Sequence, residues 1–520
     1  MQKRKIKYRV KIVFGIFIIL HILFAVYLGI QKINYHYDEY LTFSLANNSI
    51  GALDIENGKV YSGFSLYEDY LSVKNTERFD YKGVWKNQAA DVHPPFYYVI
   101  IHTICSLFPG QFSKWFGIIP NIFFMISIDF LFFRLARSIL KNDWLALVTT
   151  VAAGTSMLAM NMVIFIRMYE MMTFFVVGIS LLFAVYYNKD RDWKFYTGCY
   201  LFAIGGTMTQ YYFLIYLFFL CSFFAIRLLL QRKWKEILWF ITAFAAAGAS
   251  CILIFPAIVK QIFGGSIRGK QAFSAIQTFH NYDKYLEEYY DILNTNIFGG
   301  LFIWILLISV LLMIVMLYKK GWKSCAKGID TVPVMLLSAG ILYILLIAKI
   351  APYRTMRYVM PIGWIFILFS VWFLYKSVTN IVNISHLNRL SGGILVMLLF
   401  IAVNALGKSE WRYQYDYANS AEYFDIAEEY SDCSVIYVYK IRSRTVCNAG
   451  ELKRYKDYVF TKSKGLKELV EKTEESPVLI YIANNYDENE IIDTVLEADS
   501  HFEKADFLFK SGYAKVYYVE

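Results

Sequence analysis

Apolar segments of about 20 residues alternate with short polar segments through the first 400 residues of this chain. Crossing the hydrocarbon core of a bilayer takes about 20 consecutive apolar residues in a helix. This length and spacing predict an all-α polytopic membrane domain with about eleven transmembrane helices. We expect them at residues 12–30, 116–135, 144–163, 170–187, 196–213, 214–230, 237–258, 300–318, 332–349, 358–375 and 391–407.

The positions of Lys and Arg predict the orientation of these spans. Cationic clusters occur at residues 1–11, 134–141, 189–194, 227–235, 319–327 and 376–389. Short loops rich in Lys and Arg stay on the cytoplasmic side of a membrane. An odd number of spans, with all six clusters inside, predicts a multi-pass protein of the cell (plasma) membrane. Its N-terminus would be cytoplasmic and its C-terminus extracytoplasmic.

One apolar run does not fit the alternation. Phe96 to Phe108 is only about 13 residues long, which is too short to span. Counting it as a span would also turn every later cationic loop outward. We therefore expect a short helix on the outer face, within a first outer loop at 31–115. A second long outer loop is expected at 259–299.

The chain changes character after residue 407. Residues 408–520 are polar and mixed in charge. They contain predicted strands at Ser434–Tyr439, Val478–Ala483 and Tyr513–Val519, and predicted helices at Ser420–Tyr430 and Lys464–Lys472. The sequence thus predicts a transmembrane domain at 1–407 and a small extracytoplasmic α/β domain at 408–520. Cys433 and Cys447 could form a disulfide there or remain two thiols.

Composition narrows the class of function. The chain is 57% hydrophobic, with a mean hydropathy of +0.41 and a net charge of +10. Because the cations lie mainly in loops between spans, the charge sets orientation, and we expect no nucleic-acid partner. The sequence contains no HExxH, GxSxG or CxxC motif, so hydrolase and redox chemistry have no support.

Two adjacent carboxylates, Asp38 and Glu39, follow the first span. Ionisable groups near lipid are costly, which favours a functional site. Neighbouring residues point about 100° apart on a helix, so only one of the two would face a ligand, and the other would cap or orient. The alternative is a polar helix start with Asp38 as its cap.

A second motif lies at Asp91-Val92-His93-Pro94-Pro95. Two prolines restrict the backbone and suit the first turn of a helix. They would hold Asp91 and His93 rigidly before the short outer helix. The alternative is an ordinary proline-initiated helix with a chance histidine.

Arginines on the predicted outer face form the third signal. Arg167, Tyr169 and Glu170 lie between two spans, and Arg354, Arg357 and Tyr358 precede another. Positive-inside bias disfavours arginine there, and a lipid phosphate would explain it because guanidinium matches phosphate geometry. The alternatives are an internal Arg167–Glu170 pair and simple contact with anionic lipid. Tyr211, at the outer end of a span, would line the same cavity.

These motifs together resemble the GT-C membrane glycosyltransferases, and most of all the protein O-mannosyltransferase and aminoarabinose-transferase type. The resemblance covers about residues 1–410 and rests on the order of four elements. These are Asp38-Glu39, the run from His93 to Tyr98, Arg167-Met168-Tyr169, and Arg357-Tyr358 followed by Pro361. Two departures concern the acceptor: Glu170 stands where many members carry Asp, and the C-terminal domain matches no family domain.

The resemblance implies a hexosyl- or pentosyltransferase that uses a polyprenyl-phosphate sugar, of the undecaprenyl type, on the outer face of the membrane. Its acceptor would be a cell-envelope glycan, lipid or protein. Asp38 would be the general base of an inverting reaction, assisted by Glu39 and His93, and Asp91, Tyr169, Glu170 and Tyr211 would line the cavity. Arg167, Arg354, Arg357 and Tyr358 would hold the donor phosphate. Asp38, Glu39 and His93 could also be ligands of a divalent cation, and no other cofactor is indicated.

Two other classes of function remain open from the sequence. One is a flippase or transporter of lipid-linked sugars, which charged groups near the middle of the membrane would favour. Here the charged groups gather at the outer face instead. The other is a non-catalytic membrane scaffold whose outer domain binds cell-wall polymer. The sequence does not indicate an oligomeric state.

The predicted orientation has a direct test. Single cysteines introduced at Phe108 and Lys141 should react with membrane-impermeant maleimide from opposite sides of the membrane, because one predicted span separates them. Labelling of both from the same side would contradict the short outer helix at 96–108.

Overall fold

The structure is a computed structural model. It describes residues 2–48, 53–263, 265, 267–278, 280–321, 330–381, 420–473 and 477–520. The chain divides into two compact units, which are described separately below. Unit 1 comprises residues 1–27, 91–97 and 118–411, and unit 2 comprises residues 28–90, 98–117 and 412–520.

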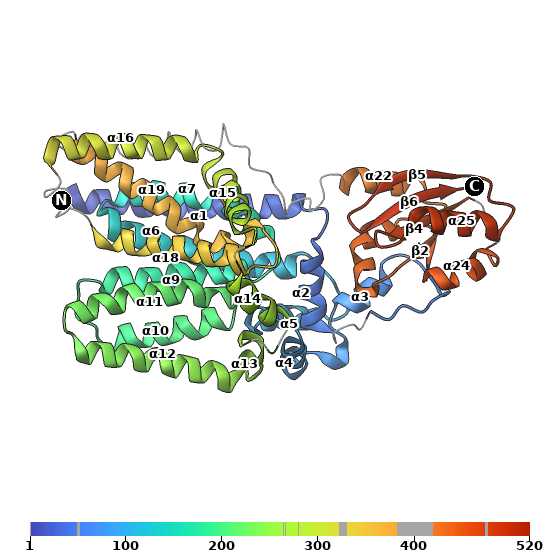
Figure 1. The fold of residues 1–520 in the computed structure, drawn as a ribbon, viewed down its shortest axis with the longest axis horizontal. Coiled ribbons are helices and arrows are strands. Elements are labelled where there is room, and N and C mark those ends of the chain that lie inside the picture. Colours follow the sequence, from blue (N-terminus) through green and yellow to red (C-terminus); the bar gives the residue numbers. More distant parts are fainter. Residues whose placement is uncertain are drawn as a thin grey trace. The chain divides into compact units, whose positions relative to one another are not determined.

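Unit 1 is a bundle of apolar helices (Figure 1). Within the described residues, eight helices are long and apolar enough to cross a membrane. They are α1 (Gln2–Gln31), α6 (Trp115–Leu140), α9 (Tyr169–Tyr186), α11 (Tyr212–Leu230), α12 (Trp234–Ile254), α16 (Phe302–Lys320), α18 (Thr331–Ile350) and α19 (Met360–Ile381). The chain is therefore a multi-pass membrane protein.

Two further predicted spans differ in form from these eight helices. The span predicted at 144–163 is a pair, α7 (Asp143–Gly154) and α8 (Met157–Ile164), bent by 55° at their junction. The span predicted at 196–213 is α10 (Trp193–Thr207), which has only 15 residues. The one predicted at 391–407 lies outside the described residues. The described part thus holds eight spans, or nine with the bent pair, and the predicted count of eleven is not confirmed.

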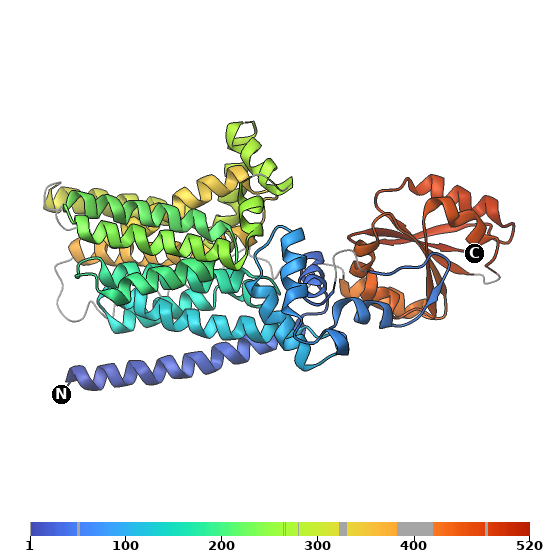
Figure 2. The same cartoon turned by 90° about the horizontal axis from the view of Figure 1, so that it is seen from below.

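The two ends of the bundle differ in chemistry. Successive helices run back and forth, as Figure 2 shows for the bundle seen from below. One end carries structural ion pairs and hydrogen bonds, such as Arg191–Glu236 at 2.7 Å and Arg227–Asn188 at 2.7 Å. The other end collects the non-helical links between α8 and α9, between α10 and α11, and between α18 and α19. Irregular backbone at these links needs partners within the protein or water.

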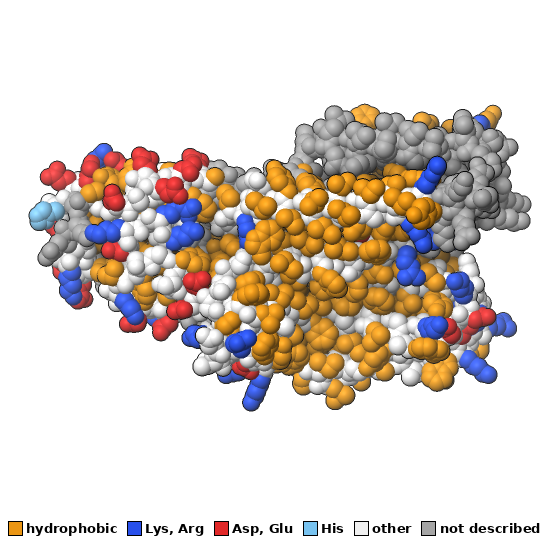
Figure 3. All heavy atoms as spheres, turned by 180° about the vertical axis from the view of Figure 1, so that it is seen from behind, with side chains coloured by type: hydrophobic (Ala, Val, Ile, Leu, Met, Phe, Trp, Pro, Cys, Tyr) orange, Lys and Arg blue, Asp and Glu red, His pale blue; other side chains and the backbone are white. Residues whose placement is uncertain are grey.

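The face of the bundle seen in Figure 3 is largely apolar where described residues form it, as expected for contact with lipid chains. Large exposed hydrophobic side chains lie on α12 and α16, including Leu238, Trp239, Leu253, Trp304, Leu307 and Leu311. Inside the bundle, α9 and α10 pack through glycines. A Cβ at Gly178 would collide with Phe202, and one at Gly205 would collide with Phe175, so each helix has a glycine where the other has a ring.

Three short helices connect α12 to α16 within the predicted outer loop at 259–299. They are α13 (Ala257–Ile262), α14 (Ile267–Gln277) and α15 (Tyr282–Phe298). α15 ends at Gly299, whose φ of +58° is the left-handed conformation that glycine adopts without strain. The predicted loop at 259–299 is therefore largely helical, and its last helix ends at Gly299.

Unit 2 contains a six-stranded sheet with the order β1-β3-β2-β4-β6-β5. The strands are β1 (Val60–Tyr61), β2 (Ser434–Val438), β3 (Asp457–Thr461), β4 (Val478–Ala483), β5 (Ala505–Lys510) and β6 (Ala514–Val519). β2 pairs in parallel with β3 and β4, while β1, β6 and β5 are antiparallel to their neighbours. The predicted C-terminal α/β fold is therefore observed.

Helices complete unit 2. They are α2 (Tyr37–Asn47), α3 (Ser65–Leu71), α4 (Tyr81–Ala90), α22 (Ser420–Glu429), α23 (Ala449–Leu452), α24 (Ser463–Val470) and α25 (Glu488–Ala498), with most of α5 (Phe96–Leu107) and the 3-10 segments η1 (Asn75–Glu77) and η3 (Arg442–Asn448). Leu466, Val470, Ile491 and Val495 pack against β2 and β4 in the core of the sheet. α5 confirms the short apolar helix predicted at 96–108.

Most of the predicted outer loop at 31–115 belongs to the same unit as the C-terminal residues. β1 pairs with β3 through Val60–Val459 and Tyr61–Tyr458. The hydroxyls of Tyr67 and Tyr458 donate to the carbonyls of Thr445 and Gly63. Residues 420–520 thus share a core with this loop, while the predicted boundary at 407 lies outside the described residues.

No disulfide joins Cys433 and Cys447, both of which the structure describes. Of the two alternatives that the sequence left open, the bridged one is therefore not observed.

A buried carboxyl lies beneath the sheet of unit 2. Glu451 is 2% exposed, and its carboxyl accepts a hydrogen bond from Nδ2 of Asn448. The Oδ1 atom of Asn448 in turn accepts a hydrogen bond from the Tyr437 hydroxyl. Burial raises the pKa of Glu451 to about 7, although Asn448 and the charge of Arg454 act in the opposite direction. A carboxyl with a raised pKa binds its proton more tightly in the folded state than in the unfolded state.

This carboxyl makes the stability of unit 2 depend on pH. As pH rises from about 4.5 to 7, folding should lose about 3 kcal/mol from Glu451, because the unfolded chain releases the proton first. Hydrogen exchange of the β2 and β4 amides, corrected for the intrinsic effect of pH, measures this loss. Glu451→Gln should remove the dependence, and the exposed control Glu490→Gln should keep it. An unchanged dependence in Glu451→Gln would show that another group titrates.

Candidate functional site

Asp91, His93 and Arg167 form a connected group in unit 1. Nδ1 of His93 lies 2.7 Å from Oδ2 of Asp91, and Nε2 of His93 lies 3.3 Å from Nη2 of Arg167. Pro94 and Pro95 follow at once, and the first amide of α5, that of Phe96, donates to the Met208 carbonyl at 3.1 Å. The predicted grouping of Asp91 with His93 is thus present, and Arg167 joins it.

The contacts of His93 determine which ring nitrogen carries its proton. An arginine side chain has only donors, so Nε2 of His93 must accept from Arg167. Nδ1 then carries the proton and donates it to Asp91. His93 therefore links Asp91 to Arg167, with one hydrogen bond on each side of the ring.

Asp91 is held as a carboxylate. Burial alone would raise the pKa of its carboxyl. The interactions with His93 and the charge of Arg167 outweigh burial and hold this pKa below its usual value. The backbone carbonyl of Asp91 accepts a hydrogen bond at 2.7 Å from Gln261 of α13. Oε1 of Gln261 in turn accepts from the Tyr211 hydroxyl at 2.5 Å, so Tyr211 is connected to Asp91 through Gln261.

Arg357 and Tyr358 form a second part of this end of unit 1. Both lie in the short 3-10 helix η2 (Met356–Tyr358) and are buried, at 7% and 6% exposed. The Tyr358 ring packs edge-on against Tyr169, with the ring centroids 6.1 Å apart. Because Tyr169 is two residues from Arg167, which is 4% exposed, the two arginine segments are packed against each other.

Arg354 is placed differently from Arg357. Its guanidinium lies 3.5 Å from the centroid of Tyr285 and its Nε lies 3.5 Å from the Glu288 carboxylate, both on α15. About a fifth of the side chain is exposed. Arg354 therefore links α15 to the segment just before η2, whereas Arg357 is buried within η2.

Two further polar side chains, Glu170 and Asn121, are buried in this unit. Glu170 is 1% exposed, and its Oε2 atom has no hydrogen-bond partner among the described residues. Asn121 of α6 donates to the carbonyls of Val163 and Phe165 and accepts from the Tyr97 hydroxyl. Asn121 thus satisfies the backbone where α8 ends, just before Arg167. This role of Asn121 could not be predicted, because a single Asn in an apolar helix can have many functions.

Asp38 and Glu39 belong to unit 2 and differ sharply from each other. Glu39 is fully buried, and its Oε2 accepts from Nζ of Lys32 at 3.0 Å and from the His36 amide at 2.7 Å. His36 caps α2 by accepting from the Asp38 amide, which forms a capping box with Glu39. The cap is therefore His36, and the alternative of Asp38 as cap is wrong. The Asp38 side chain is 22% exposed.

Metal binding finds little support in this arrangement. Within the described ranges, no group of three or more His, Cys, Asp or Glu side chains is placed to hold a metal ion. Glu39 is one of the three predicted metal ligands, but its Oε2 atom already accepts hydrogen bonds from Lys32 and from the His36 amide.

The structure thus collects most of the predicted site residues into two groups. Asp91, His93, Arg167, Tyr169, Glu170, Tyr211, Arg357 and Tyr358 lie at one end of the unit 1 bundle. Asp38 and Glu39 begin α2 in unit 2. Lys32, Asn121 and Gln261 were not predicted, because each acts through a partner that only the tertiary fold brings near.

Comparisons with known proteins give structural neighbours only. No family model matches the chain, and no curated protein matches it. Two solved structures of ArnT from Cupriavidus metallidurans, an aminoarabinose transferase, are similar to this chain at 10% sequence identity. Each match covers 96% of this chain and 97% of the ArnT chain. The TM-score is 0.49 for the apo state and 0.46 for the state bound to undecaprenyl phosphate.

A third neighbour is the archaeal oligosaccharyltransferase AglB from Archaeoglobus fulgidus, in complex with an inhibitory peptide and a dolichol-phosphate. It has 10% identity and a TM-score of 0.42, over 97% of this chain and 74% of that chain. ArnT and AglB are both GT-C glycosyltransferases, the type that the motifs of this sequence resemble. The ligands named are those of the two neighbours.

The role of Asp91 in fixing the His93 proton is testable. Asp91→Ala should shift the His93 ring away from a single Nδ1–H tautomer, because Nδ1 loses its acceptor. The ¹⁵N chemical shifts of the imidazole report this directly.

Asp499→Ala is a matched control for this variant. Nδ1 of His501 lies 2.7 Å from Oδ1 of Asp499 with the same spacing in sequence, but the His501 side chain is 83% exposed. Water can replace the lost acceptor there, so the His501 tautomer should change little. A His93 tautomer that survives Asp91→Ala would show that Arg167 alone holds the ring.

Proposed function

We propose that this protein is a membrane glycosyltransferase that uses a polyprenyl-phosphate sugar as donor. The sugar would pass to a hydroxyl or amine of a cell-envelope acceptor on the outer face of the membrane. In this proposal the donor phosphate is bound by Arg167, Arg357 and Tyr358. Asp38 acts as the general base, and Glu39 positions the start of α2.

The observation that carries the proposal is the pair of buried arginines at one end of the membrane bundle. Arg167 and Arg357 are 4% and 7% exposed, and both lie in irregular segments where spans begin. A guanidinium near lipid is costly and marks a site for a charged substrate. Its planar fork matches the oxygens of a phosphate, and a lipid phosphate stays at the level of the span ends.

Tyr358 and His93 support the same assignment. Tyr358 is held by the Tyr343 hydroxyl, which donates to its carbonyl at 2.6 Å, and by the Tyr212 ring at 5.1 Å. His93 holds Arg167 through one hydrogen bond. Side chains fixed before the substrate arrives stabilise developing charge without rearrangement, which is how charged leaving groups are commonly assisted.

The proposed reaction is a direct displacement. The acceptor oxygen attacks the anomeric carbon and forms the new glycosidic bond, while the bond from that carbon to the phosphate oxygen breaks. Its electron pair leaves with the polyprenyl phosphate, whose added charge the arginines stabilise. The acceptor proton passes to the Asp38 carboxylate. Attack from the opposite face inverts the anomeric centre.

The proposal separates the roles of Asp38 and Arg357. Asp38→Asn should lower the transfer rate at least 100-fold, the usual contribution of general base catalysis, with donor binding unchanged. Arg357→Gln should weaken donor binding instead, by about tenfold or more, since a charge-assisted hydrogen bond contributes roughly 1.5–3 kcal/mol. Transfer of radiolabelled sugar in membranes and binding of polyprenyl phosphate to purified protein measure the two effects.

Two controls complete this experiment. Asp487→Asn changes a carboxylate at the start of α25 in the same unit as Asp38, and Arg227→Gln changes an arginine at the opposite end of the bundle from Arg357. Both should leave transfer and donor binding unchanged. Full transfer by Asp38→Asn would disprove its role as base, and unchanged donor affinity in Arg357→Gln would remove it from the phosphate site.

A further inference from the structure

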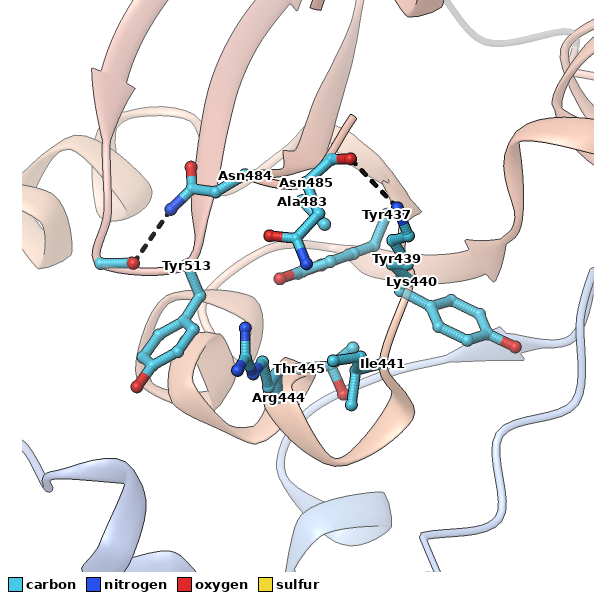
Figure 4. Close-up of a pocket in the computed structure, with 11 residues that line it drawn as sticks. Tyr437, Tyr439, Lys440, Ile441, Arg444, Thr445, Ala483, Asn484, Asn485 and Tyr513 are labelled. Carbon is cyan, nitrogen blue, oxygen red and sulfur yellow. Dashed lines mark hydrogen bonds between the residues drawn. The ribbon is translucent and has the colours of Figure 1, made fainter. Parts of the chain in front are cut away.

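A cavity opens at the carboxyl ends of the two central parallel strands of unit 2 (Figure 4). Its volume is about 190 Å³. Lys440 follows β2, and Asn484 and Asn485 follow β4. From β2 the chain passes first to β3, on one side of β2, and then to β4, on its other side. The connections therefore leave the sheet in opposite directions at β2 and β4, which makes the gap between these strands a topological switch point. In open α/β sheets, ligands bind in the crevice at this switch point.

The lining of the cavity favours an anionic, hydroxyl-rich ligand. It contains two cations, Lys440 and Arg444, and none of its eleven lining residues is acidic. Figure 4 shows the Arg444 guanidinium and the Asn485 side chain pointing into the space between them. An arginine binds carboxylate or phosphate through paired hydrogen bonds, and amides recognise hydroxyls as both donors and acceptors.

Tyr513 forms one wall of the cavity. The Arg444 guanidinium lies 5.8 Å from the centroid of its ring, which fixes the cation beside an aromatic surface. A tyrosine ring offers both an apolar face and a polar edge, and a sugar ring presents C–H groups and hydroxyls in the same way. The volume is below the roughly 300–1,000 Å³ of pockets for drug-sized ligands, so it suits a single small unit.

The same wall contacts the helix that carries Asp38. The ring of Tyr37 lies 5.9 Å from that of Tyr513, and its hydroxyl lies 3.0 Å from that of Ser443, next to Arg444. Tyr37 is the first residue of α2, directly before Asp38. The cavity is therefore built onto the start of α2.

We propose that this cavity binds an anionic sugar unit of the acceptor glycan, through Arg444, Lys440 and the two asparagines. The identity of this ligand as the acceptor rests on the proposed function. The site would hold a carboxylate- or phosphate-bearing unit of the acceptor glycan. A hydroxyl on a neighbouring unit of the same glycan would then receive the donor sugar. Unit 2 thereby selects the acceptor.

The test uses the full chain in detergent and three soluble probes. In ligand-observed NMR titrations, glucuronate or glucose 6-phosphate should bind at least tenfold more tightly than glucose. The first two probes distinguish a carboxylate ligand from a phosphate ligand. Arg444→Gln should weaken that binding at least tenfold, while Arg442→Gln, an exposed arginine of the same 3-10 segment that does not line the cavity, should not.

Two outcomes would overturn the proposal. One is equal binding of glucose and the anionic probes, and the other is an equal effect of Arg442→Gln and Arg444→Gln, which would indicate nonspecific attraction. Asp38→Asn should bind the probes as well as the wild type does, so this test is independent of catalysis. In a transfer assay, Arg444→Gln should raise the acceptor KM with kcat unchanged, and a loss of kcat alone would contradict an acceptor site.

Discussion

The need to satisfy every backbone polar group within a bilayer shapes this protein more than any other constraint. A helix does so internally, whereas irregular backbone needs partners from elsewhere in the protein or from water. The links before α9, α11 and α19 all lie at one end of unit 1, and polar side chains gather there to serve them. Asn121 binds the carbonyls of Val163 and Phe165, and Gln261 binds that of Asp91. A set of polar groups built to hold backbone thus also surrounds Arg167 with fixed neighbours.

Glu39 and Asp38 show how adjacent carboxylates acquire opposite roles. Glu39 lies in a fully buried pair with Lys32 and completes the capping box of α2. Removing one partner of such a pair leaves an uncompensated buried charge, at a cost of about 3–5 kcal/mol. Glu39 is therefore structural, whereas the Asp38 side chain is 22% exposed and so remains accessible to solvent. Helical geometry alone predicts that the two point apart, but choosing between them requires knowledge of Lys32.

Apolar length in the sequence predicted eight of the spanning helices, and the order of the motifs led us to group Asp91, His93, Arg167 and Arg357, which lie at one end of unit 1. These patterns did not reveal β1, β3 or β5. β1 has only two residues, and β5 shows no regular alternation of buried and exposed positions, so pairing rather than propensity defines these strands. Gln261 lies 170 residues from the Asp91 carbonyl that it binds, and α10 is shorter than its apolar run suggests. Such features depend on tertiary packing.

The pairing of β1 with β3 has a consequence for how the protein is made. The ribosome completes β1 roughly 400 residues before it reaches β3, and several membrane helices are synthesised in between. At about 5–20 residues per second, the first loop waits on the order of tens of seconds without its partner. During that interval Tyr67 lacks the surface that buries it in the finished fold, and β1 lacks the strand with which it pairs. Biogenesis of this protein therefore includes a late step, after membrane insertion, in which the two distant segments find each other.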